Sequence, residues 1–235
     1  RHQAAATPQD ELAAGSPRQP ESIHPQALLA QVLDRANLQR ALKQVRQNKG
    51  APGTDGMTVD ELPQYLKQHW PEIRVQLETG RYRPQPVKRV EIPKPDGGKR
   101  GLGIPVVVDR VIQQAISQVL TEVFEPEFSE HSYGFRPNKS AHQALKQAEI
   151  YINSGYKVVV DMDLEKFFDR VNHGKLMHLI SGKVSDKRVL KLVRGYLTAG
   201  VMTTGICVKS KEGTPQGGAI SPTLMNMTLD GLERL

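Results

Sequence analysis

The chain has 235 residues, with 32 Lys and Arg against 25 Asp and Glu and a formal net charge of +7 at pH 7. This length can bury a core in one large or two small domains, and no apolar run is long enough to span a membrane, so we expect a soluble protein. The positive charge favours a polyanionic partner. The single cysteine, Cys207, excludes an internal disulfide framework and a cysteine-based zinc site, which suits a reducing compartment, and we expect the cytoplasm.

Both ends of the chain have the pattern of a fragment. It begins with Arg1 rather than Met, and it stops at Leu235 while apolar residues still recur at helical spacing from Leu224. Residues 1–25 mix Ala, Gln, Pro, Ser and charged residues without periodicity, so we predict a disordered leader there.

Helical periodicity dominates residues 26–80. Apolar residues recur at helical spacing after Leu28 and again from Leu38, and Thr58 with Glu61 forms a capping-box pattern before a further helix. A loop rich in Gly and Pro over 50–56 separates these helices. We predict a helical N-terminal extension.

The segment 81–155 mixes strand and helix patterns. Two runs, 87–92 and 100–104, flank an Asp-Gly-Gly turn and predict a β-hairpin with a basic rim. An amphipathic helix is predicted over 108–123, with Arg110 and several glutamines on its polar face. After a loop, Ser140 and Gln143 form a second capping box, at the start of a helix to about Asn153.

The stretch 156–169 is the one around which we expect the rest to be organised. Its Val158–Val160 run predicts a strand buried on both faces. Asp161 and Asp163 differ by two, so in a strand they would point to the same face, where a divalent cation would relieve their repulsion. Alternatively these acids begin a helix, since Asp and Glu favour a first helical turn, and spacing alone leaves both open.

The remaining patterns predict two helices, then a strand or hairpin, then a Gly-rich turn and a final helix. Their ranges are 175–180 and 186–197 for the helices, 201–208 for the hairpin and 212–218 for the turn. Helices and hairpins mixed around a buried strand predict an α+β fold rather than a doubly wound sheet.

Several motifs bear a resemblance to one family. Asp163 followed by Phe167, Phe168 and Asp169 resembles the first catalytic motif of reverse transcriptases. The resemblance implies that Asp163 is catalytic and binds Mg²⁺ with the main-chain carbonyl of Leu164, and that Phe168 blocks a ribose 2′-hydroxyl.

The predicted hairpin tip, from Lys94 to Arg100, brings basic residues around a tight turn where they could converge on a phosphate group. Taken alone it is more often a solvated tip. It resembles the fingers hairpin of reverse transcriptases, which implies that Lys94 and Arg100 grip the nucleotide triphosphate and places Arg110 in the helix that follows, on the RNA template.

Two further loops match the same family. The loop Ser132–Arg136 is typical either of an ordered loop with buried rings or of RNA stacking, and the resemblance implies template contacts for Phe135 and Arg136. The second loop, Gly213–Pro222, contains Pro-Gln-Gly-Gly followed by Ser-Pro, although Gly-Gly and Ser-Pro are also common in ordinary loops.

In this second loop, the resemblance implies that Gln216 binds the nucleotide and supports the templating base pair. Pro215 and Gly217 then lie on the template, with Gly217 permitting close backbone approach.

Together the resemblance covers about Leu38 to Leu235, in the family's motif order, and is to bacterial-type group II intron-encoded reverse transcriptases, or maturases. The loop around 48–56 matches an N-terminal extension that retroviral enzymes lack. The resemblance implies fingers over 81–155 and an incomplete palm over 156–235, since the family's aromatic-Ala-Asp-Asp motif does not appear.

The function implied is an RNA-directed DNA polymerase that acts in retrohoming and intron splicing, with this fragment inactive alone. Its implied partners are intron RNA as template, a DNA primer, deoxynucleoside triphosphates and a second copy in a homodimer, with no membrane. One alternative is an RNA-binding maturase without catalysis; another is a domesticated reverse transcriptase in defence or diversification.

Overall fold

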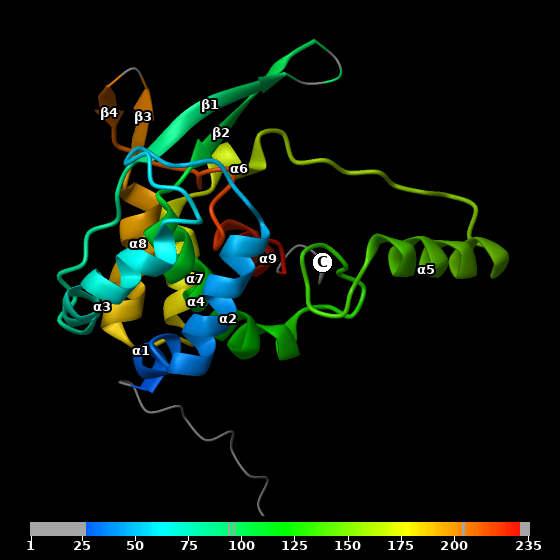
Figure 1. Ribbon diagram of the computed structural model, residues 1–235. Coiled ribbons are helices and arrows are strands. Elements are labelled where there is room, and N and C mark those ends of the chain that lie inside the picture. The colour runs from blue at the N-terminus through cyan, green and yellow to red at the C-terminus, as the bar shows by residue number, and fades with distance from the viewer. Residues whose placement is uncertain (1–26, 94, 96, 204, 231–235) are drawn as a thin grey trace, which may run out of the picture.

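The computed structural model describes residues 27–93, 95, 97–203 and 205–230; the predicted leader, Lys94 and the predicted helix continuation at Leu235 lie outside them. The helices are α1 (Ala27–Val32), α2 (Arg35–Gln47), α3 (Leu62–Glu78), α4 (Val107–Phe124), α5 (Ala141–Asn153), α6 (Phe167–Arg170), α7 (His173–Ser181), α8 (Lys187–Thr198) and α9 (Ser221–Leu229), with a 3₁₀ turn, η1, at Glu125–Glu127. The strands are β1 (Val87–Pro93), β2 (Lys99–Ile104), β3 (Val201–Thr203) and β4 (Ile206–Val208). This mixture of helices with one sheet confirms the α+β class (Figure 1).

Local sequence signals explain where two helices begin. Thr58 N–H donates to Glu61 Oε2 at 2.8 Å, and Glu61 N–H donates back to Thr58 Oγ1 at 3.4 Å, as a capping box requires. Ser140 Oγ accepts from Gln143 N–H at 3.3 Å ahead of α5. The predicted cap at Ser140 is therefore confirmed, whereas the Thr58–Glu61 bonds close a turn just before α3, whose N-cap residue is Glu61. Of the helices described, none combines the length and apolar character needed to cross a bilayer.

Helix α4 is the centre of the hydrophobic core. Helices α1, α2 and α9 pack against it, and one cluster of buried apolar side chains runs from Leu28 to Met227. Burial of each large side chain in such a cluster contributes about 1.5–3 kcal/mol. The predicted polar face of α4 is wrong for Arg110 and Gln113, which are both buried, because neighbouring segments cover the helix on that side as well.

A buried carboxylate joins α4 to two other parts of the fold. Asp109 is fully buried and accepts hydrogen bonds from Tyr82 Oη at 2.8 Å, Gln85 N–H at 2.9 Å and Tyr196 Oη at 3.2 Å. Burial raises the pKa of this carboxyl to about 6, although the three hydrogen bonds oppose that shift. Asp109 thereby fixes the segment before β1, and helix α8, against α4.

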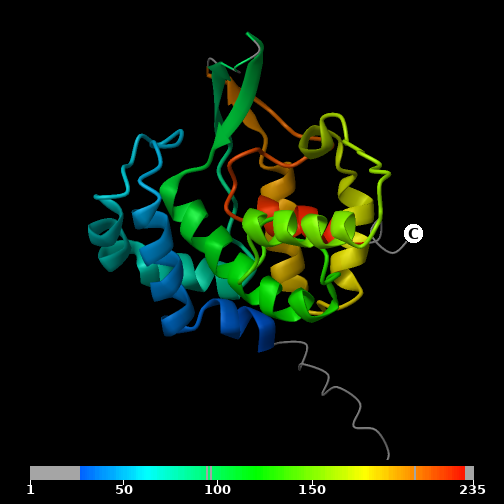
Figure 2. The ribbon, with the colours of Figure 1, turned by 90° about the vertical axis from the view of Figure 1, so that its right-hand side faces the viewer.

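The sheet has the order β2-β1-β3-β4, so β2 and β4 are its edges. Strands β1 and β2 form the predicted hairpin, in which Arg89 lies opposite Gly103 and Ile92 lies opposite Arg100. Strand β3 pairs in parallel with β1 and antiparallel with β4. The helices lie below this hairpin in Figure 2.

Helix α5 and the segment after it extend away from the core. No residue of α5 is buried, and the helix projects to the side in Figure 1. The chain returns to α6 through 156–164 without pairing with any described strand, and Val158 is 87% exposed. The predicted buried strand at Val158–Val160 is therefore wrong. β-branched residues favour an extended backbone, but a strand also needs a partner strand, which the described residues do not provide.

Candidate functional site

A cavity of about 540 Å³ lies beside the β1–β2 hairpin. Three segments far apart in the sequence form its walls: the hairpin strands, the residues around α6, and the loop 210–216. Its basic lining residues are Arg89, Lys99, Arg100 and Lys166, and its acidic lining residues are Asp169 and Glu212. Basic side chains outnumber acidic ones, so the cavity favours an anion.

The loop that contains Gln216 follows the free edge of β2. Gly103 N–H donates to the Gln216 carbonyl at 2.8 Å. Gly217 has φ +111°, and a Cβ there would lie 2.8 Å from the Gly103 carbonyl oxygen. The predicted need for glycine at 217 is therefore confirmed, although the close approach is to the protein's own strand.

The same loop is also fixed to the α6 segment. Gly213 N–H donates to the Val171 carbonyl at 2.8 Å, and Thr214 N–H donates to the Phe168 carbonyl at 2.7 Å. Gly213 has φ +78°, and a Cβ there would lie 2.7 Å from the Asp169 carbonyl oxygen. Backbone hydrogen bonds therefore hold Phe168 and Gln216 in one fixed arrangement.

The hairpin cations do not all share one face of the sheet. Side chains alternate along a strand, and cross-strand partners lie on the same face. The register therefore places Lys99 on the face of Arg89, with Arg100 on the opposite face. The predicted convergence of Lys99 and Arg100 on one phosphate group stays a prediction, because both residues line the cavity although they lie on opposite faces of β2. Lys99 forms an exposed ion pair with Glu91 at 3.1 Å.

The rings of Phe167 and Phe168 lie next to one another. Their centroids are 6.1 Å apart at an interplanar angle of 67°, and both are partly buried against the core. Phe168 does not line the cavity, whereas its neighbour Asp169 does. The sugar-excluding role of Phe168 stays a prediction.

The predicted metal ligands lie in an exposed part of the chain. Asp163 and Leu164 are in the unpaired segment 156–164, and both are exposed. Within the described ranges, no three His, Cys, Asp or Glu side chains are grouped so that they could hold a metal ion.

Two arginines predicted to contact RNA have partners inside the protein. Arg136 pairs with Glu125 at 2.9 Å, its side chain is only 5% exposed, and its guanidinium also donates to the carbonyls of Ser129 and Ser132. Arg110 is buried and donates to the Pro105 carbonyl at 2.9 Å. The structure therefore gives both arginines a stabilising role.

Phe135 lies in a different environment from its neighbour Arg136. Its side chain is 79% exposed, and its backbone has φ +54°. An exposed ring of this kind is suited to stacking on a base.

Sequence reasoning missed three residues of this site. Arg89 and Lys166 line the cavity, and the Nε2 atom of buried His173 lies 2.6 Å from the Gly213 carbonyl oxygen. The two-residue spacing between Val87 and Arg89 was a signal that could have placed Arg89 on the same face of β1 as buried Val87. No local pattern predicted the contact between His173 and Gly213, because these residues are 40 positions apart.

The chain belongs to the reverse transcriptase (RNA-dependent DNA polymerase) family, whose model matches residues 92–235. The chain is 34% identical over 219 residues to Protein YkfC of Escherichia coli strain K12. It is 36% identical over 195 residues to the group II intron-encoded protein LtrA of Lactococcus lactis subsp. cremoris. These matches confirm the predicted resemblance to group II intron-encoded proteins.

The chain spans only part of these relatives. The two alignments cover 91% and 83% of this chain, but 58% of YkfC and 32% of LtrA. A solved structure, the partial Cas6-RT-Cas1–Cas2 complex, matches with a TM-score of 0.60 at 22% identity, over 88% of this chain and 34% of that one. This likeness supports the fold alone.

Proposed function

We propose that the chain is the nucleotide- and template-binding part of an RNA-directed DNA polymerase of the group II intron type, which copies intron RNA in retrohoming and assists its splicing. The observation that supports this most is the double attachment of the Gln216 loop, to the edge of β2 and to the α6 segment. This attachment brings Gln216 and Arg100 to one cavity with a surplus of basic residues.

In the proposed reaction, a primer 3′-hydroxyl attacks the α-phosphate of a deoxynucleoside triphosphate and releases pyrophosphate. The cavity cations bind the phosphate chain, Gln216 lies beside the base pair being formed, and exposed Phe135 stacks on the RNA. Binding and orientation are thus the tasks that this chain's own residues perform.

We propose magnesium as the metal of the complete enzyme, since carboxylate and carbonyl oxygens are its preferred ligands. Asp163 and the Leu164 carbonyl are two such donors, but the described residues include no grouped set of three acidic or imidazole side chains. This chain alone is proposed to bind nucleotide and RNA without polymerising.

The maturase function is the second candidate. It needs RNA binding only, which the net charge of +7 and the exposed Phe135 support.

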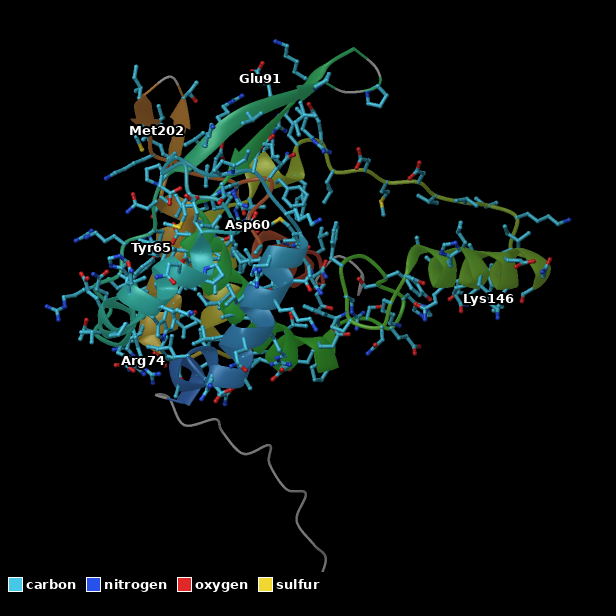
Figure 3. All side chains as sticks on the ribbon, in the orientation of Figure 1. Asp60, Tyr65, Arg74, Glu91, Lys146 and Met202 are labelled. Carbon is cyan, nitrogen blue, oxygen red and sulfur yellow. The ribbon has the colours of Figure 1, made fainter. Side chains whose placement is uncertain are left out.

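A crosslinking and extension experiment tests the proposal. A photoreactive deoxynucleoside triphosphate should crosslink to the purified chain in the presence of an RNA template and DNA primer, and Arg100→Ala should reduce the yield several-fold. Lys146→Ala, on α5 away from the cavity (Figure 3), is the control. RNA retention without nucleotide crosslinking would favour the maturase, whereas magnesium-dependent extension abolished by Asp163→Ala would show a complete catalytic site.

A further inference from the structure

Lys166 has a backbone conformation that lysine rarely adopts. Its φ and ψ are 52° and 37°, in the left-handed region, immediately before α6. For a residue with a Cβ this conformation costs about 1–2 kcal/mol, whereas glycine adopts it without that penalty. Strained residues of this kind cluster at functional sites, which points to a role for the Lys166 side chain in the cavity that it lines.

Among the described residues that line the cavity, Lys166 is the one basic residue that does not come from the hairpin. The other three basic lining residues, Arg89, Lys99 and Arg100, come from the β1–β2 hairpin, and Lys166 comes from the α6 side. Its ammonium lies 3.8 Å from Glu165 Oε1, and both side chains are well exposed, at 63% and 74%. An exposed ion pair of that length contributes little, so it does not prevent the ammonium from binding another anion.

The shape of this arrangement favours a compact polyanion. Cations that line one cavity of about 540 Å³ from two separate segments can neutralise charge that is concentrated on a few adjacent phosphates. A polynucleotide backbone instead distributes single charges along its length and needs an extended basic stripe. A lysine ammonium suits a compact polyanion, because it acts as a point charge on a flexible side chain.

We propose that Lys166 binds the phosphate chain of the incoming nucleotide from the side opposite the hairpin. This inference rests on the proposed function and adds a residue to it. The strained backbone at Lys166 then lowers the stability of the fold in return for placing a cation on this side of the cavity. Lys166→Gly should therefore raise the stability of the chain and weaken its binding of phosphate.

The test measures tripolyphosphate and dATP binding to the purified chain by isothermal titration calorimetry, together with Tm. Lys166→Ala should raise both dissociation constants about three- to tenfold at low salt, and Lys166→Arg should retain most of the affinity. Lys166→Gly should lose the same affinity and raise Tm, because it relieves the strain. Lys146→Ala should change neither quantity.

The other outcomes distinguish a failure of the Lys166 proposal from a failure of the proposed nucleotide site. If Arg100→Ala weakens binding while Lys166→Ala and Lys166→Gly bind like the unmodified chain, the role of Lys166 is wrong and the proposed nucleotide site stands. If the unmodified chain binds neither ligand, or if Arg100→Ala binds normally as well, the nucleotide site itself is wrong. Equal losses of tripolyphosphate and single-stranded RNA binding in Lys166→Ala would make Lys166 a general RNA contact and overturn the proposal.

Discussion

The imidazole Nε2 of His173 donates a hydrogen bond to the carbonyl oxygen of Gly213 at 2.6 Å, and both residues are buried. Nε2 must carry the proton, because a carbonyl oxygen can only accept. The bond joins the first turn of α7 to the loop of Gln216, next to the backbone bonds between that loop and Phe168. His173 is therefore a positioning residue, which acts on the cavity through the loop.

Replacement of His173 by leucine should loosen this loop. The Gly213 carbonyl would lose a buried donor, at a cost of about 1–3 kcal/mol, and the dissociation constant for dATP should rise as Gln216 becomes less fixed. His173→Gln, whose amide can also donate, should recover part of both losses. Tm and calorimetric binding of the two variants check this. A fall in Tm equal for both variants, with unchanged dATP affinity, would leave His173 as an ordinary core residue.

The pKa of Asp109 makes a contribution to stability that depends on pH. Its folded-state pKa is about 6 against an ordinary value of 3.8, so between these values the folded chain holds a proton that the unfolded chain has lost. This contribution to the free energy of unfolding therefore falls as pH rises from about 4 to 6, by about 3 kcal/mol, and is constant above pH 7.

Urea unfolding of the unmodified chain and of Asp109→Asn at several pH values isolates that contribution. The difference in free energy of unfolding, unmodified minus variant, should decrease between about pH 4 and 6 and then level off. Asp161→Asn, in the exposed segment 156–164, is the matched control. A difference for Asp109→Asn that does not change with pH would contradict the prediction.

Phe168 and Phe167 form a matched pair for testing sugar selection. Both rings are partly buried against the core, so either change to alanine should lower Tm. Only Phe168→Ala should reduce the preference for dATP over ATP, because the family resemblance places Phe168 beneath the sugar. The ratio of the two dissociation constants measures this preference. An unchanged ratio in Phe168→Ala, or an equal change in Phe167→Ala, would remove the proposed role.

Adjacent residues in the loop 132–136 should separate RNA binding from stability. Phe135→Ala removes an exposed ring and should weaken single-stranded RNA binding by about 1–3 kcal/mol with little change in Tm. Arg136→Ala removes the partner of Glu125 and the donor to the Ser132 carbonyl, and should cost several kcal/mol of stability. Fluorescence anisotropy and thermal unfolding distinguish these effects. The reverse pattern would restore Arg136 as the RNA contact.

The sequence predicted most of the elements whose signal is local. The bonds between Thr58 and Glu61, the cap at Ser140 and the hairpin around the Asp-Gly-Gly turn depend on residues a few positions apart, and all three are present. The predicted strand at Val158–Val160 depended on a partner strand elsewhere, which no local pattern can specify.

In the candidate site, too, local sequence patterns did not specify contacts between distant segments. The glycine at 217 could be predicted from its motif, whereas the burial of Arg110 depends on a distant segment that includes Ala51. The opposite faces of Lys99 and Arg100 follow from the alternation of side chains along a strand, once β2 is seen to begin at Lys99.

The exposed segment 156–164 also divides the chain into two parts that remain in contact elsewhere. Before it lie α1 to α5 with β1 and β2, and after it lie α6 to α9 with β3 and β4. Contacts between α4 and α9, between α1 and α8, and between β1 and β3 cross this division, and none of them uses the segment itself. A single cut after exposed Lys157 would therefore leave two pieces held together by a shared core and a shared sheet. Two separately expressed halves joined in this way would make the chain a natural candidate for fragment complementation.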